Sequence, residues 1–490
     1  MTVPEFNKPV TTVTVIPTAT STRVHCFVRQ APVTSSEASR GDHNGRVSVQ
    51  PTGFEGGLLV GLYDPHLGPQ CAEYLQQHLV PILDESLSTQ LDHSDDDHHQ
   101  NPNTCKIDPT QVVDTLKSTF KELDELLLAT AITVALTQPE TADQLPSEEE
   151  LKKTQEVIAR VVTGSTALVG FLAPHTAPSS ATTTGSETND AVLKHDLYLA
   201  QLGDSVAILA GFDAQGQWTA QRLNPPETHE HSVRYQGSEE YRKVVSEVKE
   251  RALTVEQFLT QHNGSSQHDH NGVDTDGASI GGAHESFLTK DGKFLGLPVT
   301  RAFGDLDWKL EQEARFSVAT WVEKSLRAKI DQALGSGQQQ QESNGEGSMS
   351  GRSQDEAGIN NLSDPPYVSA DPRISRFVLE TRKPSHPDPQ RASNQLLILV
   401  NRGLLYTTAH STTNSNRNGT DAGGKPNPYD QALISDFELS RLVSSALEKG
   451  EENCAAAVAK VLDQTRKDLG VANSEGEEEG LEGSVVAIVL

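Results

Sequence analysis

The sequence is short of apolar residues, aromatic residues and positive charge. Hydrophobic residues make up 35% of the 490 residues, aromatic residues make up 5%, and the formal net charge at pH 7 is -28. The apolar share is below the roughly 45 to 50% that is usual for a globular domain. A strongly acidic chain repels polyanions and copies of itself, so we expect no nucleic-acid partner and a monomer.

Long apolar runs and cysteine pairs are also missing. No run approaches the roughly 18 apolar residues of a membrane span, and residues 1–30 lack the apolar centre of a secretory signal. We therefore expect no membrane partner. The four cysteines are far apart and form no C-x-x-C pair, which excludes a zinc knuckle or a disulfide framework. A reducing compartment is then the default.

The first residues leave two intracellular locations open. They are rich in Ser and Thr and include Arg23, Arg29 and Arg40, as in a mitochondrial presequence, but Glu5 and the late first arginine argue against one. We expect an intracellular protein, either cytoplasmic or mitochondrial.

The missing apolar content is concentrated in tracts rich in Ser, Thr, Gly, Gln, Asn and His. These tracts lie near residues 93–104, 174–190, 262–285, 335–361 and 411–427. Their composition cannot bury enough surface to offset the entropy of ordering, so we interpret them as disordered loops. What remains predicts one interrupted domain over residues 36–490, after a flexible N-terminal segment over residues 1–35.

The spacing of apolar residues predicts both helices and strands. Helices are expected over residues 69–83, 112–136, 147–162, 239–251, 322–334, 431–447 and 455–469. Strands are expected around residues 13–15 and 24–28, and over 164–172, 196–202, 206–210, 376–379, 396–400 and 485–490. A turn at Gly203-Asp204-Ser205 would join two of these strands into a meander. Strands in hairpin-like groups and helices in pairs favour an α+β fold, a sandwich of two antiparallel sheets flanked by helices.

Two apolar runs have the pattern of buried strands and are followed by polar residues that would lie at the strand tips, where metal-binding side chains commonly lie. The run from Leu58 to Leu62 is followed by Tyr63 and then Asp64, which could present a carboxylate there. The run from Leu396 to Val400 is followed by Asn401 and then Arg402. If the two tips face each other, a guanidinium stands where a dication would need a carboxylate.

Five short motifs occur in a fixed order along the chain. They are Tyr63-Asp64-Pro65-His66-Leu67-Gly68, Gly164-Ser165-Thr166-Ala167, Ala200-Gln201-Leu202-Gly203-Asp204-Ser205, Thr300-Arg301-Ala302-Phe303-Gly304-Asp305 and Val400-Asn401-Arg402-Gly403-Leu404. Together they resemble the metal-dependent PPM-type serine/threonine protein phosphatases. The stretches 296–299 and 365–372 make the pyruvate dehydrogenase phosphatase branch the most similar one.

The resemblance implies an αββα sandwich with two Mg²⁺ or Mn²⁺ ions in a central cleft, bridged by the water that attacks a phosphoester. It implies that Asp64 is the bridging metal ligand and that Pro65 offers a backbone carbonyl in place of a glycine. It also implies that His66 is a general acid for the leaving oxygen and that Asp204 lies near an additional metal ion.

Three other metal positions depart from the family pattern. An expected acidic pair appears as Gly41-Asp42, so that Asp42 alone is a ligand candidate there. Arg402 replaces one aspartate of the family pattern. Gly483 replaces another, and Glu482 lies next to it. Arginine in place of aspartate changes the local charge by two units. Each unit of positive charge at about 4 Å from a dication costs about 8 kcal/mol with an effective dielectric constant of about 20.

We therefore expect a catalytically impaired PPM-type protein, a pseudophosphatase that acts as a binding or regulatory module for a phosphorylated or other protein and holds no metal ion. The alternative is an active Mg²⁺- or Mn²⁺-dependent serine/threonine phosphatase with remodelled ligands, in which Asp42, Asp64, Asp204 and Glu482 hold at least one ion.

Each site residue also has a simpler interpretation. Asp64 alone would suit a strand-ending turn, His66 would suit the cap of the helix that follows, and Asp204 suits a turn between strands. Arg402 could face solvent, stand in for the metal ion, or bind a phosphate group of a partner. We favour the stand-in, because an arginine between Asp42 and Asp64 would neutralise both.

Overall fold

The computed structural model describes the chain in separate stretches. These are residues 23–29, 45–53, 57–92, 108–137, 147–175, 192–213, 215–224, 299–311, 313–322, 368–382, 395–401, 435–448, 457–462, 464 and 483–490. The chain divides into two compact units. Its composition predicts one interrupted domain over residues 36–490. Unit 1 comprises Met1–Leu123, Gly164–Pro226 and Ala370–Leu490, and unit 2 comprises Asp124–Thr163 and Glu227–Ser369.

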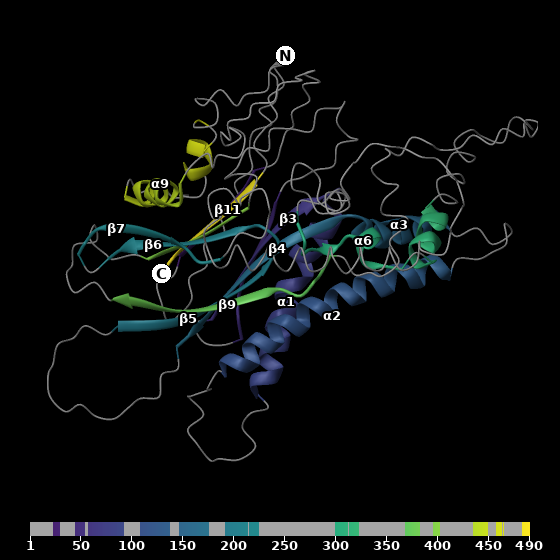
Figure 1. The fold of residues 1–490 in the computed structure, drawn as a ribbon, viewed down its shortest axis with the longest axis horizontal. Helices are drawn as coiled ribbons and strands as arrows, with labels where there is room; N and C mark the ends of the chain where they lie inside the picture. Colours follow the sequence, from purple (N-terminus) through teal and green to yellow (C-terminus); the bar gives the residue numbers. More distant parts are fainter. Residues whose placement is uncertain are drawn as a thin grey trace, which may run out of the picture. The chain divides into compact units, whose positions relative to one another are not determined.

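Unit 1 contains two antiparallel sheets (Figure 1). The first sheet has the strand order β1 (Arg23–Arg29), β11 (Gly483–Val489), β10 (Leu396–Val400), β6 (Val206–Phe212) and β7 (Trp218–Arg222). The second has the order β2 (Arg46–Pro51), β3 (Leu58–His66), β4 (Gly164–Pro174), β5 (Val192–Leu202) and β9 (Arg373–Arg382). Neighbours far apart in sequence, such as β6 and β10, therefore bring distant motifs together.

Helices cover the outer faces of the two sheets. Helix α1 (Gln70–Asp92) packs on β2, β3 and β4 of the second sheet, and α9 (Asp436–Glu448) packs on β6 and β7 of the first. Helix α2 (Pro109–Leu136) begins in unit 1 and ends in unit 2. The predicted fold class, two antiparallel sheets flanked by helices, is confirmed. No helix in the described part of the chain is long and apolar enough to cross a membrane.

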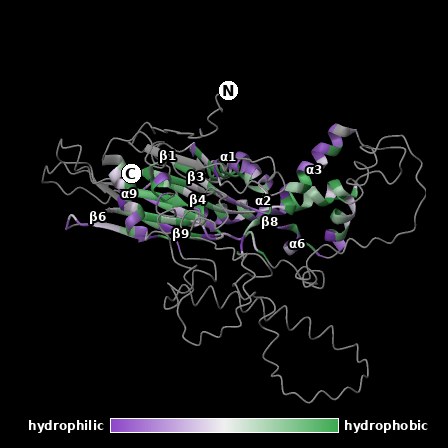
Figure 2. Ribbon diagram, turned by 90° about the horizontal axis from the view of Figure 1, so that it is seen from above, coloured by the Kyte–Doolittle hydropathy of each residue, from purple (hydrophilic) through white to green (hydrophobic). Residues whose placement is uncertain are grey.

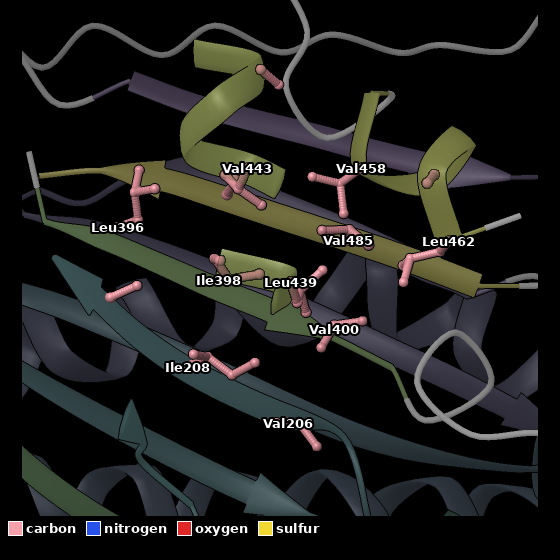
Figure 3. Close-up of a cluster of buried hydrophobic side chains, with 14 residues drawn as sticks. Val206, Ile208, Leu396, Ile398, Val400, Leu439, Val443, Val458, Leu462 and Val485 are labelled. Carbon is pink, nitrogen blue, oxygen red and sulfur yellow. The ribbon is translucent and has the colours of Figure 1, made fainter. Parts of the chain in front are cut away.

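The two faces of the first sheet are buried in different cores. One face packs under α9 and the helix over residues 457–462, with side chains that include Ile398, Val400, Leu439 and Val458 (Figure 3). The other face packs against the second sheet and forms the inner core of the sandwich. Its residues are Leu58, Val60, Leu62, Leu168, Leu172, Leu197, Leu199, Ala207, Leu223, Leu379, Leu397, Leu399, Val486 and Ile488. Figure 2 shows the resulting concentration of hydrophobic residues in the strands.

The turn at residues 203–205 does not make a meander. Strand β5 pairs with β4 and β9, whereas β6 pairs with β10 and β7, so the turn carries the chain from one sheet to the other. That prediction was wrong because a Gly-Asp-Ser turn suits a hairpin and a crossing between sheets equally well. Gly203 supplies the positive φ of 100° that the turn requires.

Unit 2 contains α3 (Glu148–Val162), the short strand β8 (Phe303–Gly304), α6 (Leu306–Lys309) and a helix over residues 313–322. The predicted capping box of α3 is present, since the Ser147 hydroxyl accepts from Glu150 N and the Glu150 carboxylate accepts from Ser147 N. A buried ion pair joins Lys309 Nζ to Asp124 Oδ2 at 2.7 Å, and Gly304 N donates to Asp124 Oδ1 at 2.9 Å. This pair holds the turn around β8 to the second half of α2.

The strand predicted around residues 24–28 is present as β1, which pairs with β11 along its whole length. One boundary differs from the sequence predictions. Helix α9 begins at Asp436 and not at 431, because Ser435 and Glu438 form a second capping box. The helix predicted over 239–251, most of 322–334 and all the low-complexity tracts except residues 174–175 lie outside the described residues.

Candidate functional site

A layer of polar side chains closes one end of the inner core. Leu62, Leu168, Ala207, Leu399 and Val486 belong to that core. Because side chains alternate along an extended chain, the residue two positions nearer this end lies on the same face. Those residues, hereafter the polar layer, are Asp64, Thr166, Ser205, Asn401 and Ser484. Asp64, Thr166 and Ser484 lie on β3, β4 and β11, and the other two residues directly adjoin β6 and β10. Both sheets therefore contribute polar side chains to one end of the sandwich.

On the second sheet, Asp64 of β3 lies directly opposite Thr166 of β4. Pro65 is buried opposite Ser165, and His66, the last residue of β3, is half-buried opposite Gly164. The described pairing of β2 with β3 ends at Tyr63, so the missing N–H of Pro65 costs no hydrogen bond on that side. The residue after the strand, Leu67, has a positive φ of 61°.

On the first sheet, Asn401 follows β10 directly. Val400 pairs with Val206 on one side and with Val485 on the other, so the next position of the ladder puts Asn401 between Ser205 and Ser484. Asn401 N donates to Ser484 O at 3.2 Å, and Ser484 N donates to Asn401 Oδ1 at 2.8 Å. The side chain of Asn401 thereby closes the ladder between β10 and β11.

Asn401 also reaches across to the other sheet. Its Nδ2 donates to Asp64 Oδ1 at 3.2 Å. The orientation of the amide follows from chemistry, because the backbone N–H of Ser484 can only donate and must face the amide oxygen. The NH₂ group is therefore the part that faces Asp64, and a hydrogen-bond donor occupies the carboxylate oxygen where a cation would bind.

Three hydroxyl oxygens of the polar layer are buried without a hydrogen-bond partner within the described residues. They are Thr166 Oγ1, Ser205 Oγ and Ser484 Oγ, on residues that are 3%, 1% and 0% exposed. Gly45 lies against the layer, since a Cβ at this position would come within 2.6 Å of Ser484 Oγ and 3.2 Å of Asn401 Nδ2. Buried polar groups are normally hydrogen-bonded, so these hydroxyls have capacity for water or a small ligand.

Asp204 lies in the connection between the two sheets and is buried, with 6% exposed. Two side chains hold this connection. Gln201 Nε2 donates to Gly203 O at 2.9 Å, and Asn224 bridges the start of β6 by donating to Ser205 O and accepting from Ala207 N, both at 2.6 Å. Leu202 pairs with Ala167, so Asp204 lies at the same end of the second sheet as Asp64, two strands away. Two strand spacings are about 10 Å.

Tyr63, next to Asp64, has no acid–base role in this arrangement. Burial raises the pKa of Tyr63 far above its usual range, although the hydrogen bond with Ser48 at 2.8 Å lowers it. The phenol stays protonated at any physiological pH. Its position, one residue before Asp64, puts it on the opposite face of β3, under α1.

Several predicted site residues lie outside the described residues. Gly41, Asp42, Arg402 and Glu482 are among them, so the predictions that depend on them stay predictions. Gly483 is described as the first residue of β11, opposite Arg29.

The described residues do not fit a pair of dications. No group of three or more His, Cys, Asp or Glu side chains that could hold a metal ion occurs among them. Hard cations such as Mg²⁺ and Mn²⁺ need several oxygen ligands, mostly carboxylates. Within the described part of the polar layer, Asp64 is the sole carboxylate and an amide NH₂ group is directed at it.

The comparisons with known proteins give structural similarities alone. No protein-family model and no curated protein matches the chain. The chain is similar to a serine-threonine phosphatase 2C from Toxoplasma gondii, with 14% identity, a TM-score of 0.42 and 98% of each chain covered. Another Toxoplasma gondii phosphatase has 13% identity and a TM-score of 0.40, with 96% of this chain and 92% of that chain covered.

A further similar structure is a Caenorhabditis elegans sex determining protein, with 12% identity, a TM-score of 0.39, and 95% of this chain and 64% of that chain covered. At these low values, the similarities assign neither a family nor an activity to the chain.

The sequence pattern identified the strand tips but not the residue that joins them. Asn401 was part of a recognised motif, yet its neighbour Arg402 received the functional role. One signal could have found it, because Leu397, Leu399 and Asn401 alternate on the core-facing side of β10. That alternation puts Asn401, and not Arg402, in line with the inner core.

Proposed function

We propose that this protein is a PPM-type phosphatase-like protein that has lost its dinuclear metal centre and acts as a binding or regulatory module. Its partner would be a phosphorylated or other protein. The observation that supports this most directly is the donor set around Asp64, where an amide NH₂ group from Asn401 lies 3.2 Å from the carboxylate. A metal ligand pointing at the same ion would have to be an acceptor.

The order of the motifs supports the phosphatase part of the proposal. Asp64, Thr166, Asp204 and Asn401 come from four of the five motifs and lie at one end of the same sandwich. The fifth motif, residues 300–305, belongs to unit 2. The first and last of these motifs are more than 300 residues apart in sequence, and their meeting at one end supports the interpretation that they belong to one site.

The loss of carboxylates supports the regulatory part. Gly483 has no side chain to offer a cation, and the sequence has Arg402 where the family has an aspartate. A cation at position 402 would oppose dication binding by several kcal/mol, by the same Coulomb estimate as above.

The test combines calorimetric titration with Mn²⁺ and an assay of p-nitrophenyl phosphate hydrolysis on the full chain. Both are repeated with Arg402→Asp, and Arg402→Ala serves as the matched control that removes the charge without adding a ligand. We expect no metal binding and no metal-dependent turnover in the unmutated protein. Micromolar Mn²⁺ binding with turnover would instead support an active phosphatase of the pyruvate dehydrogenase phosphatase type, with His66 as its general acid.

A further inference from the structure

The polar layer joins the two sheets through one side chain. Asn401 Oδ1 accepts a hydrogen bond from Ser484 N, and Asn401 Nδ2 donates one to Asp64 Oδ1. The side chain thus links β10 and β11 of the first sheet to β3 of the second. Ser484 is fully buried, so its lost hydrogen bond would not be replaced freely by bulk water, whereas Asp64 is half-buried. The end of the sandwich is therefore held by a hydrogen-bonded bridge.

We propose that Asn401 is the residue that replaces the metal ion, by clamping Asp64 with its amide, and that residue 401 decides whether this end of the sandwich binds a cation. The inference rests on the proposed function, because a metal ion is expected here only from the PPM resemblance. It departs from the sequence interpretation, in which the cationic side chain of Arg402 was the stand-in.

The side chain at position 401 determines whether Asp64 faces an amide donor, hereafter the clamp, or a bound cation. The amide NH₂ group of Asn401 donates to Asp64 Oδ1, so a metal ion would compete with it for that oxygen. Replacing Asn401 by Asp would put two carboxylates about 3 Å apart, and like charges at this distance repel strongly unless a cation lies between them. The buried hydroxyls of Thr166, Ser205 and Ser484 belong to the same polar layer and have no hydrogen-bond partner among the described residues.

Gly45 leaves room for this bridge. A Cβ at position 45 would come within 3.2 Å of Asn401 Nδ2 and closer still to Ser484 Oγ. A side chain there would press on both partners of the clamp. Glycine is thus the residue that lets the segment before β2 pass close to the bridge.

The experiment measures the midpoint of thermal unfolding of the full chain, in EDTA and in MnCl₂ at matched ionic strength. The unmutated protein should be insensitive to Mn²⁺. Asn401→Asp should unfold at a lower temperature in EDTA and recover in Mn²⁺ by at least about 3 °C, because a bound cation stabilises the folded state alone. Asn401→Ala removes the clamp without adding a ligand, so it should be destabilised and show no recovery.

A reversed pair provides the matched control. In Asp64→Asn with Asn401→Asp, the layer again has one carboxylate and one amide, so Mn²⁺ should have no effect. An unmutated protein that gains stability in Mn²⁺, or an Asn401→Asp protein that gains none, would overturn the inference. If Asn401→Asp does not fold, the single variants Asn401→Ala and Asp64→Asn and the double variant that combines them still decide. If the effects of the single variants on the free energy of unfolding simply add in the double variant, the two residues are not coupled and the inference is overturned.

The two proposals fail in different ways. Turnover by the unmutated protein would remove the proposed function. Gain of Mn²⁺ affinity in Arg402→Asp, with none in Asn401→Asp, would leave the proposed function in place and assign the replacement of the metal to Arg402.

Discussion

His195 is an imidazole buried in the sandwich, with 6% of its surface exposed. Its Nδ1 atom has no hydrogen-bond partner among the described residues. Burial lowers the pKa of His195, although the nearby Asp196 carboxylate raises it. The folded state therefore favours the neutral imidazole more than the unfolded state does.

This predicts a pH dependence of stability. Because the folded pKa is below the unfolded value of about 6.5, the unfolded chain takes up a proton first as the pH falls. The stability that His195 contributes is complete above about pH 6.5 and is lost as the pH falls through the folded pKa. In His195→Gln the free energy of unfolding should therefore fall less between pH 7.5 and 5.0 than in the unmutated protein. Urea unfolding at the two pH values measures this, and equal losses in both proteins would contradict it.

The site residues that the sequence predicted most clearly lie on regular strands. Asp64 was found because it follows an apolar run, and the structure puts it at the end of β3 as expected. The partner of Asp64 was not found, because a hydrogen bond between residues 337 positions apart leaves no local trace in the sequence. The same holds for Asn224, which holds the crossing between the sheets.

At the scale of elements, α9 is fastened to the first sheet at its N-terminus. Ser435 and Glu438 cap the helix, Arg222 of β7 donates to both carboxylate oxygens of Asp436 at 3.1 and 2.7 Å, and Trp218 Nε1 donates to Ser440 Oγ at 2.9 Å. These polar contacts set the position of the helix, and Leu439 and Val443 bury its apolar side in the outer core (Figure 3).

The cap of α9 can be tested separately from its packing. Ser435→Ala removes the side chain that accepts from Glu438 N, at 3.2 Å, and should cost about 1 kcal/mol of stability. Ser435→Thr keeps a hydroxyl that can accept from Glu438 N and donate to the Glu438 carboxylate, and should lose much less. Chemical denaturation followed by circular dichroism distinguishes the two, and equal losses would show that the hydroxyl does not act as a cap.

Element boundaries depended on whether a local signal existed. Ser147 with Glu150 was recognised in the sequence and marks the start of α3. The equivalent Ser435 with Glu438 was overlooked within a longer apolar pattern, which moved the expected start of α9 upstream. Sheet membership had no local signal, because β5 and β6 are separated by three residues but belong to different sheets.

At the scale of the whole molecule, the dominant property is the formal net charge of -28. Charge of one sign opposes the compact state through self-repulsion, and salt screens this repulsion over about 10 Å at 0.1 M. Stability should therefore rise with ionic strength. Relief of about 1 kcal/mol would raise the unfolding midpoint by roughly 2 to 4 °C in a domain of about 150 to 250 residues, and by less in a larger one.

The measurement is thermal unfolding between 10 and 300 mM NaCl, with KCl in parallel. Equal effects of the two salts are expected for screening, since the Debye length depends on ionic strength and not on the identity of the ion. A midpoint that falls with added salt would show that attractive ion pairs, such as the one between Arg222 and Asp436, outweigh the repulsion.

The sequence by itself determined most of the strands and helices, although not β2 and β7, because period-two and helical spacing of apolar residues are local properties. It also located Asp64 at a strand end and Asp204 in a turn after one. The tertiary structure decided which strands pair, that the Gly-Asp-Ser turn crosses between sheets, and that the Asn401 amide faces Asp64. These depend on the distance between residues that are far apart in the chain. The same strand tips could hold either a dication or an amide bridge. Which of the two forms depends on the side chain of the first sheet that reaches the Asp64 carboxylate.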